Sequence, residues 1–312
     1  MYTAFYGLKE EPFRLTPDPR FLHLAEPHRE VLTSLVSGVV RRKGILVATG
    51  PVGTGKTTLL HAALHFLSSN STETGAIASA FLLNPTLSRE ELIEAVLDEF
   101  EVSCTSSSKT RRLAALYEML LETQRNGGTA VLVIDEAHLL TVELLEEIRL
   151  LTNADTHQEK LLQVILSGQP ELLPRLRRPE LSALKQRIAS RAELRALSLP
   201  ETRVYVAERL HAAGLRTPSP FKSASFEVIQ LHTKGVPRLI NLLCDRCLMM
   251  GFDAKKPQID SDIVAKAAVA QDLVETAAPV ERPDDLSNLK MARTSLDLLI
   301  DALKHDRAFA RD

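Results

Sequence analysis

The chain has 312 residues, of which 45% are hydrophobic and 25% charged, so it is long and apolar enough to bury a sizeable core. Its net charge of −2 excludes a global positive field for nucleic acid, though not local basic patches. Three cysteines are too few for a disulfide scaffold and suit a reducing compartment. No apolar run approaches the ~18 residues of a membrane span, and charged residues interrupt the first fourteen positions, so we expect a cytoplasmic protein without a membrane span.

The predicted elements begin with an N-terminal extension, residues 1–43, in which prolines between Phe13 and Phe21 prevent regular helix and a helix follows over 27–41. Strands are then expected at 45–49, 76–83, 130–134, 162–166 and 191–199, with helices over 56–67, after Ser88, and over 110–126 and 141–153. The first four strands are short apolar runs, whereas 191–199 alternates apolar and polar residues. Apolar strands separated by helices predict a parallel sheet covered on both faces.

From Pro200 onward the pattern is helical, with expected helices over 201–213, 223–233, 236–251 and 260–274. Four parts are therefore predicted: the extension 1–43, an α/β nucleotide-binding domain 44–199, a helical lid 200–275, and a linker with an amphipathic helix at 276–312. The last helix carries a stripe of Leu289, Leu296, Leu299 and Leu303 that needs a covering surface. Cys244 and Cys247 form a CxxC inside an apolar helix, without further metal ligands nearby, which favours packing over metal or redox chemistry.

A phosphate-binding loop is indicated by Gly50–Thr57 (GPVGTGKT), which follows a predicted strand and precedes a predicted helix. Its glycines allow main-chain N–H groups to surround phosphate oxygens at the positive end of the helix. Lys56 would bridge the β- and γ-phosphates of ATP, and the Thr57 hydroxyl would ligate Mg²⁺. The residues predicted to bind the nucleotide are Gly50, Pro51, Val52, Gly53, Thr54, Gly55, Lys56, Thr57 and Thr58.

A carboxylate pair, Asp135 and Glu136, follows the apolar strand 130–134. We expect Asp135 to hold Mg²⁺ through water and Glu136 to polarise the attacking water. The string continues to His138, as in one class of helicases, but such a helicase needs a second domain of similar fold, and the residues after 200 are helical and too few. His138 is therefore expected beside the γ-phosphate or on the surface.

Other polar side chains are predicted to complete the site. Either Ser167 or Gln169, at the end of strand 162–166, would orient water; we favour Gln169. Arg187, ahead of the fifth strand, is predicted to be an arginine finger that acts on a neighbouring subunit, with Arg191 as the second candidate. Arg238 begins a lid helix and would reach the γ-phosphate from there.

These motifs together resemble the AAA+ ATPases, and specifically the general secretion pathway protein A (ExeA-type) family. The resemblance covers about residues 1–272 and includes Tyr2–Phe13 (YTAFYGLKEEPF), Thr16–Phe21 (TPDPRF), Glu146–Asn153 (EEIRLLTN), Gly168–Leu172 (GQPEL) and Gly235–Asp245 (GVPRLINLLCD). It implies the strand order 5-1-4-3-2 with a C-terminal helical lid, Arg238 as sensor 2, and assembly into a ring or filament. The family usually has Gln where His138 stands, and its best-known members continue into a membrane span and a peptidoglycan-binding domain that we do not find here, so the chain resembles a truncated form.

Two functions follow from the resemblance. The first is an ATP-hydrolysing motor or switch that assembles a secretion or cell-surface apparatus through protein contacts. The alternative is an ATP-dependent DNA-binding regulator related to transposition or initiator ATPases. The balanced charge and the lack of a C-terminal domain of winged-helix size favour the first. A module that binds nucleotide without hydrolysing it is disfavoured by the Asp135–Glu136 pair.

Overall fold

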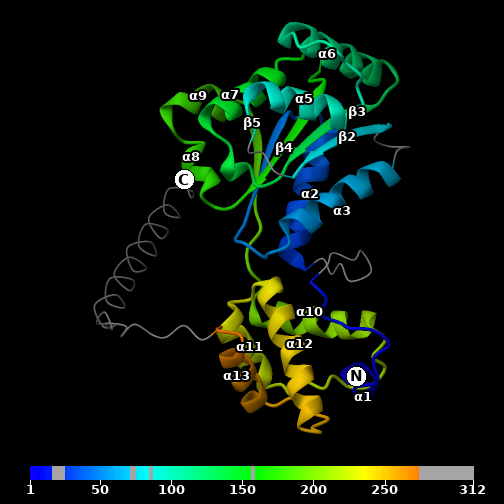
Figure 1. Cartoon of the computed structure of the whole chain (residues 1–312), viewed down its shortest axis with the longest axis vertical. Coiled ribbons are helices and arrows are strands. Elements are labelled where there is room, and N and C mark those ends of the chain that lie inside the picture. Colours follow the sequence, from blue (N-terminus) through cyan, green and yellow to red (C-terminus); the bar gives the residue numbers. More distant parts are fainter. Residues whose placement is uncertain (16–24, 71–74, 84–86, 156–158, 274–312) are drawn as a thin grey trace, which may run out of the picture. The chain divides into compact units, whose positions relative to one another are not determined.

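A parallel sheet lies at the centre of the α/β part in the computed structural model, which describes residues 1–15, 25–70, 75–83, 87–155 and 159–273 (Figure 1). Within these residues the strands are β1 Ile45–Thr49, β2 Ile77–Leu82, β3 Thr129–Ile134, β4 Leu162–Gly168 and β5 Ile188–Glu193. They pair in the order β2-β3-β4-β1-β5, all parallel. This is the predicted order 5-1-4-3-2 counted from the other edge, so the fold prediction is confirmed.

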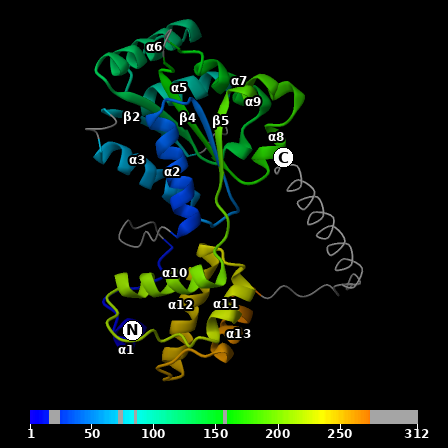
Figure 2. The ribbon, with the colours of Figure 1, turned by 180° about the vertical axis from the view of Figure 1, so that it is seen from behind.

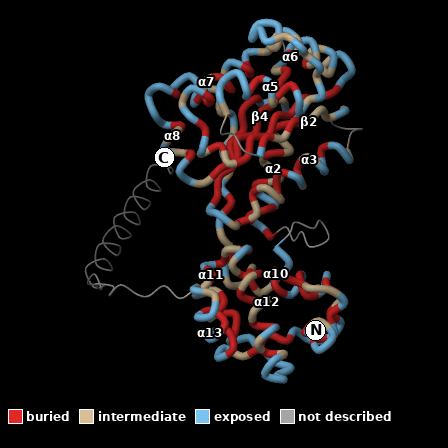
Figure 3. The backbone as a smooth tube through the Cα atoms, viewed as in Figure 1, coloured by how far each residue is buried: buried red, intermediate tan, exposed pale blue. Residues whose placement is uncertain are grey.

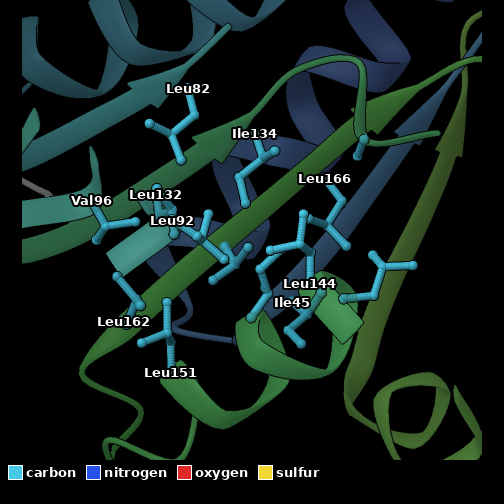
Figure 4. Packing of buried hydrophobic residues seen from close by; sticks show 14 of the residues in the cluster. Ile45, Leu82, Leu92, Val96, Leu132, Ile134, Leu144, Leu151, Leu162 and Leu166 are labelled. Carbon is cyan, nitrogen blue, oxygen red and sulfur yellow. The ribbon is translucent and has the colours of Figure 1, made fainter. Parts of the chain in front are cut away.

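Both faces of the sheet are covered because alternate residues of the central strands point to opposite sides. On β3, Val131 and Val133 pack with α2 Glu26–Val40 and α3 Lys56–Ser69, whereas Leu132 and Ile134 pack on the opposite face. That opposite face is covered by α5 Arg89–Glu99, α6 Lys109–Arg125 and α7 Val142–Leu151 (Figures 2 and 4). The central strands are therefore buried along their length, while exposed residues lie on the outer sides of the helices (Figure 3).

The fifth strand differs from its prediction, because β5 covers Ile188–Glu193 rather than residues 191–199. The ladder with β1 runs from the Ile45–Ile188 pair to the Thr49–Glu193 pair. Beyond this ladder the chain leaves the sheet, and the Leu197 amide donates to the Gly235 carbonyl at 2.9 Å. As an edge strand, β5 is only half covered, and its residues alternate between half-buried and exposed. The alternation of apolar and polar residues that predicted this strand is present, but the strand begins three residues earlier than predicted.

Short helices precede β5: η2 Ala137–Leu139 follows β3, and α8 Leu172–Arg175, η3 Pro179–Leu181 and α9 Ser182–Arg187 follow β4. The helical part that follows the sheet contains α10 Leu199–Ala212, α11 Ser225–Thr233, α12 Pro237–Asp253 and α13 Ser261–Ala270. Cys244 and Cys247 on α12 are fully buried in its core, and burial raises the pKa of both thiols. Their predicted packing role is confirmed, and the described residues hold no cluster of three potential metal ligands from His, Cys, Asp and Glu.

The first residues of the chain pack against the helical part, which the sequence pattern did not predict (Figure 1). We call residues 2–14 the N-terminal strap; it begins with α1 Tyr2–Phe5. The Tyr2 hydroxyl donates to Asp245 Oδ1 at 2.6 Å, and the buried Arg209 guanidinium donates to the Pro12 and Arg14 carbonyls at 2.7 and 3.0 Å. The strap thus supplies both apolar area and carbonyl acceptors to a core formed by helices about 200 residues later.

The described residues belong to the unit Met1–Leu273. Within them no helix combines the length and apolar character that a membrane crossing requires. The predicted leucine stripe at 289–303 lies outside the described residues. The domain boundaries after residues 43, 199 and 275 stay predictions.

Candidate active site

The phosphate-binding loop connects the end of β1 to the start of α3, as its sequence requires. Gly53 and Gly55 have φ values of +78° and +97°, a conformation that side chains disfavour, and Gly55 is the residue that caps α3. Within the loop Thr54 is fully buried and its hydroxyl donates to the Pro51 carbonyl at 2.8 Å. The glycines thus give the loop the tight curvature that directs main-chain N–H groups toward an anion at the helix start.

Lys56 lies inside this loop and is only 8% exposed. Its ammonium donates to the Gly50 and Pro51 carbonyls, at 2.9 and 3.1 Å. Burial lowers the pKa of Lys56, and the nearby carboxylates of Glu136 and Asp135 oppose that shift. A buried ammonium held by neutral carbonyls fits a polyphosphate, which would supply the compensating negative charge.

Two glycines of the loop are also needed for close packing. A Cβ on Gly50 would lie 2.5 Å from the Leu194 carbonyl oxygen. A Cβ on Gly53 would lie 2.8 Å from Cβ of Arg238, whose main-chain amide donates to the Gly53 carbonyl at 3.1 Å. Arg238 thus lies in the first turn of α12, directly beside the loop, with an exposed side chain. Val52 is exposed at the loop's tip, and Thr57 and Thr58 lie on the first turn of α3.

Asp135 is the point where three elements meet. It is 2% exposed and accepts hydrogen bonds from the Thr57 hydroxyl at 2.5 Å, from the Ser167 hydroxyl at 2.8 Å and from the Glu136 amide at 2.9 Å. The Thr57 and Asp135 oxygens are therefore adjacent, as needed for a cation that takes few protein ligands. Mg²⁺ is commonly held by one or two such groups together with water and substrate phosphates, so the residues present fit this ion.

Glu136 begins a sharp turn after β3, with a left-handed main-chain conformation at φ +50°. Its Oε2 lies 3.2 Å from Nδ1 of His138, and the other ring nitrogen of His138 lies 2.9 Å from the Gln169 side-chain nitrogen. The structure thus places Gln169 on His138, and Ser167 on Asp135. The preference for Gln169 over Ser167 as the water-orienting residue stays a prediction.

Two residues that sequence reasoning did not select also contact the site. His28 on α2 is buried, with Nε2 3.0 Å from the Thr54 carbonyl oxygen. The Arg175 guanidinium donates to the His138 and Leu140 carbonyls. Neither residue lies in a recognisable motif, and both reach the site through tertiary contacts, so no local sequence signal marks them.

Arg187 lies away from the phosphate-binding loop of its own chain. Ile188 pairs with Ile45 at the start of β1, whereas the loop follows Thr49 at its end. At about 3.3 Å per residue, the four steps from Ile45 to Thr49 place the two ends of β1 about 13 Å apart. The Arg187 guanidinium instead donates to the Thr152 hydroxyl at 3.2 Å, and Arg191 is exposed. Arg187 is therefore held away from the nucleotide site of its own subunit.

Comparison with known proteins agrees with this geometry. Residues 40–176 match the AAA domain family. The chain is 41% identical to general secretion pathway protein A of Aeromonas hydrophila over 253 residues, which is 81% of this chain and 45% of that protein. It therefore spans about half the length of that curated relative.

Solved structures show the same fold at low sequence identity. The ORC2 protein of Aeropyrum pernix, in ADPNP–ADP complexes, has a TM-score of 0.62 at 15% identity, covering 86% of this chain and 73% of that one. A structure of Drosophila ORC bound to DNA has a TM-score of 0.63 at 17% identity, covering 88% and 67%. The solved structures share the fold, with its parallel sheet, and the chain is thus a relative of general secretion pathway protein A that contains an AAA domain at residues 40–176.

Proposed function

We propose that this protein binds and hydrolyses ATP with Mg²⁺, and that it acts as a motor or switch in the assembly of a secretion or cell-surface apparatus. The observation that carries the ATPase proposal is the arrangement at Asp135. One carboxylate joins the Thr57 hydroxyl after the phosphate-binding loop to the Ser167 hydroxyl at the end of β4. Lys56, buried in the loop, adds the positive charge that a polyphosphate needs.

The chain's own residues take distinct roles in this proposal. The main-chain N–H groups of the phosphate-binding loop and of the first turn of α3, together with the Lys56 ammonium, bind the phosphates, and Thr57 with Asp135 would hold Mg²⁺, which when bound neutralises charge on the phosphate oxygens. Glu136, half-exposed beside the loop's edge, orients the water and accepts its proton. Ser167 fixes the Asp135 carboxylate, and Arg238 reaches the γ-phosphate from α12.

Glu136→Gln tests the chemistry separately from binding. The amide keeps the shape of the carboxylate and a hydrogen-bonding end but cannot accept the proton of water. We expect near-normal affinity for a fluorescent ATP analogue and a fall in Mg²⁺-dependent phosphate release of at least about 100-fold, in the range typical of lost general-base catalysis. Glu136 would lose its proposed role if the variant turned over within a few fold of the parent.

The proposed role in surface assembly is supported by the relative that matches 81% of this chain, general secretion pathway protein A. The Glu136→Gln variant offers a direct test, since it should remain in the ATP-bound state and retain its partner. Capture from a native extract, with Lys56→Ala as the nucleotide-free control, should enrich components of a secretion or surface-assembly system only with the first variant. Equal recovery with both variants would argue against an ATP-dependent contact with such a system.

The alternative, a DNA-binding regulator, rests on the sequence resemblance, since the structural likeness to ORC bound to DNA is at 17% identity and concerns the fold. DNA binding through phosphate contacts weakens steeply with salt. A titration with duplex DNA at about 50 and 200 mM salt distinguishes the two functions. Affinity that falls by orders of magnitude over this range supports the alternative, and absence of binding at the lower salt removes it.

A further inference from the structure

The Glu136 carboxylate has an incomplete set of hydrogen bonds. Its Oε2 atom is buried, and no described residue offers it a well-aligned hydrogen bond. Nδ1 of His138 lies 3.2 Å from this oxygen. Leaving a buried carboxylate oxygen without a hydrogen-bond donor is unfavourable. The surroundings of Glu136 therefore favour any arrangement in which His138 donates to it.

His138 is contacted by residues at the end of β4 and in the segment that follows it. Its Nδ1 and Nε2 lie 3.4 Å from the main-chain nitrogen and 2.9 Å from the side-chain nitrogen of Gln169. The His138 carbonyl accepts from the Arg175 guanidinium, and a Cβ on Gly168 would come within 3.1 Å of the His138 amide nitrogen. The imidazole, with a side-chain exposure of 13%, is thus confined on the side away from Glu136.

The two neutral tautomers of His138 leave Glu136 in different states. With the proton on Nδ1, the ring presents an N–H group 3.2 Å from Oε2 of Glu136, and Nε2 accepts from the Gln169 amide at 2.9 Å, but the Gln169 main-chain N–H loses Nδ1 as its acceptor. With the proton on Nε2, Nδ1 accepts only the long 3.4 Å contact from the Gln169 main chain, and Oε2 of Glu136 keeps no donor. The first tautomer is the one that brings a donor to the buried carboxylate, and it keeps the shorter of the two Gln169 contacts, so it is the tautomer in which His138 can position Glu136.

We propose that His138 is a positioning residue for Glu136, with its Nδ1–H aiming the carboxylate and Gln169 fixing the imidazole. This inference rests on the proposed ATPase activity. The backbone of Glu136 is set by its left-handed turn, but its side chain has three rotatable bonds, and the His138 contact limits them. Misplacement of a reacting group by about 1 Å costs on the order of 100-fold in rate. Glu136 therefore needs a partner that restricts where its oxygens lie.

Substitutions at position 138 separate the proposed donor from the bulk of the ring. His138→Ala removes the donor, whereas His138→Asn keeps an N–H at about the position of Nδ1 but cannot reach Gln169. Leu139→Ala, at a half-exposed neighbour in the same short helix η2, controls for disturbance of the turn. Binding is measured with a fluorescent ATP analogue, and chemistry by single-turnover hydrolysis with Mg²⁺.

We expect His138→Ala to bind ATP within about 2-fold of the parent and to hydrolyse it about 10- to 100-fold more slowly. His138→Asn should recover most of the lost rate, and Leu139→Ala should hydrolyse at the parental rate. In a Glu136→Gln background, His138→Ala should cause no further loss, because the two residues act as one unit.

Three results would overturn the proposal: parental hydrolysis by His138→Ala, no recovery in His138→Asn, or an equal further loss when His138→Ala is added to Glu136→Gln. A loss of nucleotide binding in His138→Ala would instead give the residue a binding or structural role, and would also contradict it. If the parent protein itself releases no phosphate from ATP, the proposed function fails rather than the role of His138.

Discussion

At the residue scale, the surroundings of Lys56 favour the binding of an anion. Its ammonium is buried and its acceptors are the neutral carbonyls of Gly50 and Pro51. We predict that Lys56→Ala abolishes tight binding of a fluorescent ATP analogue, because the loop loses its point charge. Lys56→Arg serves as a matched control that keeps the charge but not the compact ammonium, and it should retain only part of the affinity. Undiminished binding by the alanine variant would contradict the assignment of the loop.

Residues within a local string were accessible to prediction, whereas those joined by tertiary contacts were not. The loop 50–57 and the Asp135–Glu136 pair each carry their spacing and their strand context in one short segment. The contact between His138 and Gln169 joins positions 31 residues apart and depends on how the ends of β3 and β4 turn. Sequence reasoning placed His138 beside the γ-phosphate or on the surface, and neither alternative includes Gln169.

At the element scale, strand prediction succeeded where both faces of a strand are buried. For β1 the predicted and observed ranges are the same, 45–49, because four apolar residues and Thr49 are bounded by Gly44 and Gly50. The edge strand β5 has no such bounds, and its start was misplaced by three residues. The N-terminal strap was missed for another reason. Its aromatic residues contact helices that lie far away in the sequence, so they show no helical or strand periodicity of their own.

The burial of Cys244 and Cys247 on α12 predicts that these thiols react slowly with thiol reagents. Burial raises the pKa of Cys247 to about 12 and that of Cys244 well above its usual value. The thiolate is the reactive form, and at pH 8 a thiol of pKa 12 is ionised in only about one molecule in ten thousand. A chromogenic disulfide reagent should therefore modify only the half-buried Cys104 in the native protein, and all three cysteines in guanidinium.

Cys104→Ser provides the control for this measurement. In its folded state this variant should not react with the reagent during the assay. Rapid modification of Cys244 or Cys247 in the native variant would mean that α12 opens readily, and the burial on which the prediction rests would not describe the protein in solution.

At the scale of the whole molecule, the position of Arg187 predicts that activity requires neighbouring subunits. Arg187 precedes β5, at the end of the strands opposite to the phosphate-binding loop. It contacts Thr152 in its own chain. A finger supplied by a neighbour is worth on the order of 10³–10⁵ in rate in well-studied cases. We predict that Arg187→Ala binds ATP but hydrolyses it poorly, and that parental activity rises more than linearly with protein concentration.

Mixing two inactive variants gives the sharper measurement. Arg187→Ala retains Glu136, and Glu136→Gln retains Arg187, so a mixed assembly contains some complete sites between subunits. Phosphate release should partly return on mixing. A mixture of Lys56→Ala with Glu136→Gln is the negative control: the loop lysine and the base belong to the same subunit, so no site in that mixture has both, and it should stay inactive even when the subunits mix. Mass measurement that detects mixed assemblies without recovered activity would exclude Arg187 and make Arg191 the next candidate.

The N-terminal strap has a consequence for how the protein is made. The hydrogen bond between Tyr2 and Asp245 joins positions 243 residues apart. At roughly 5–20 residues per second of synthesis, the opening segment waits roughly 10–50 s for its partner helix. During that time Tyr2, Tyr6 and Phe13, all buried in the finished protein, remain in contact with water or with a chaperone. The sheet can form before α12 exists, so the N-terminal strap is synthesised before the sheet but reaches its native contacts after it.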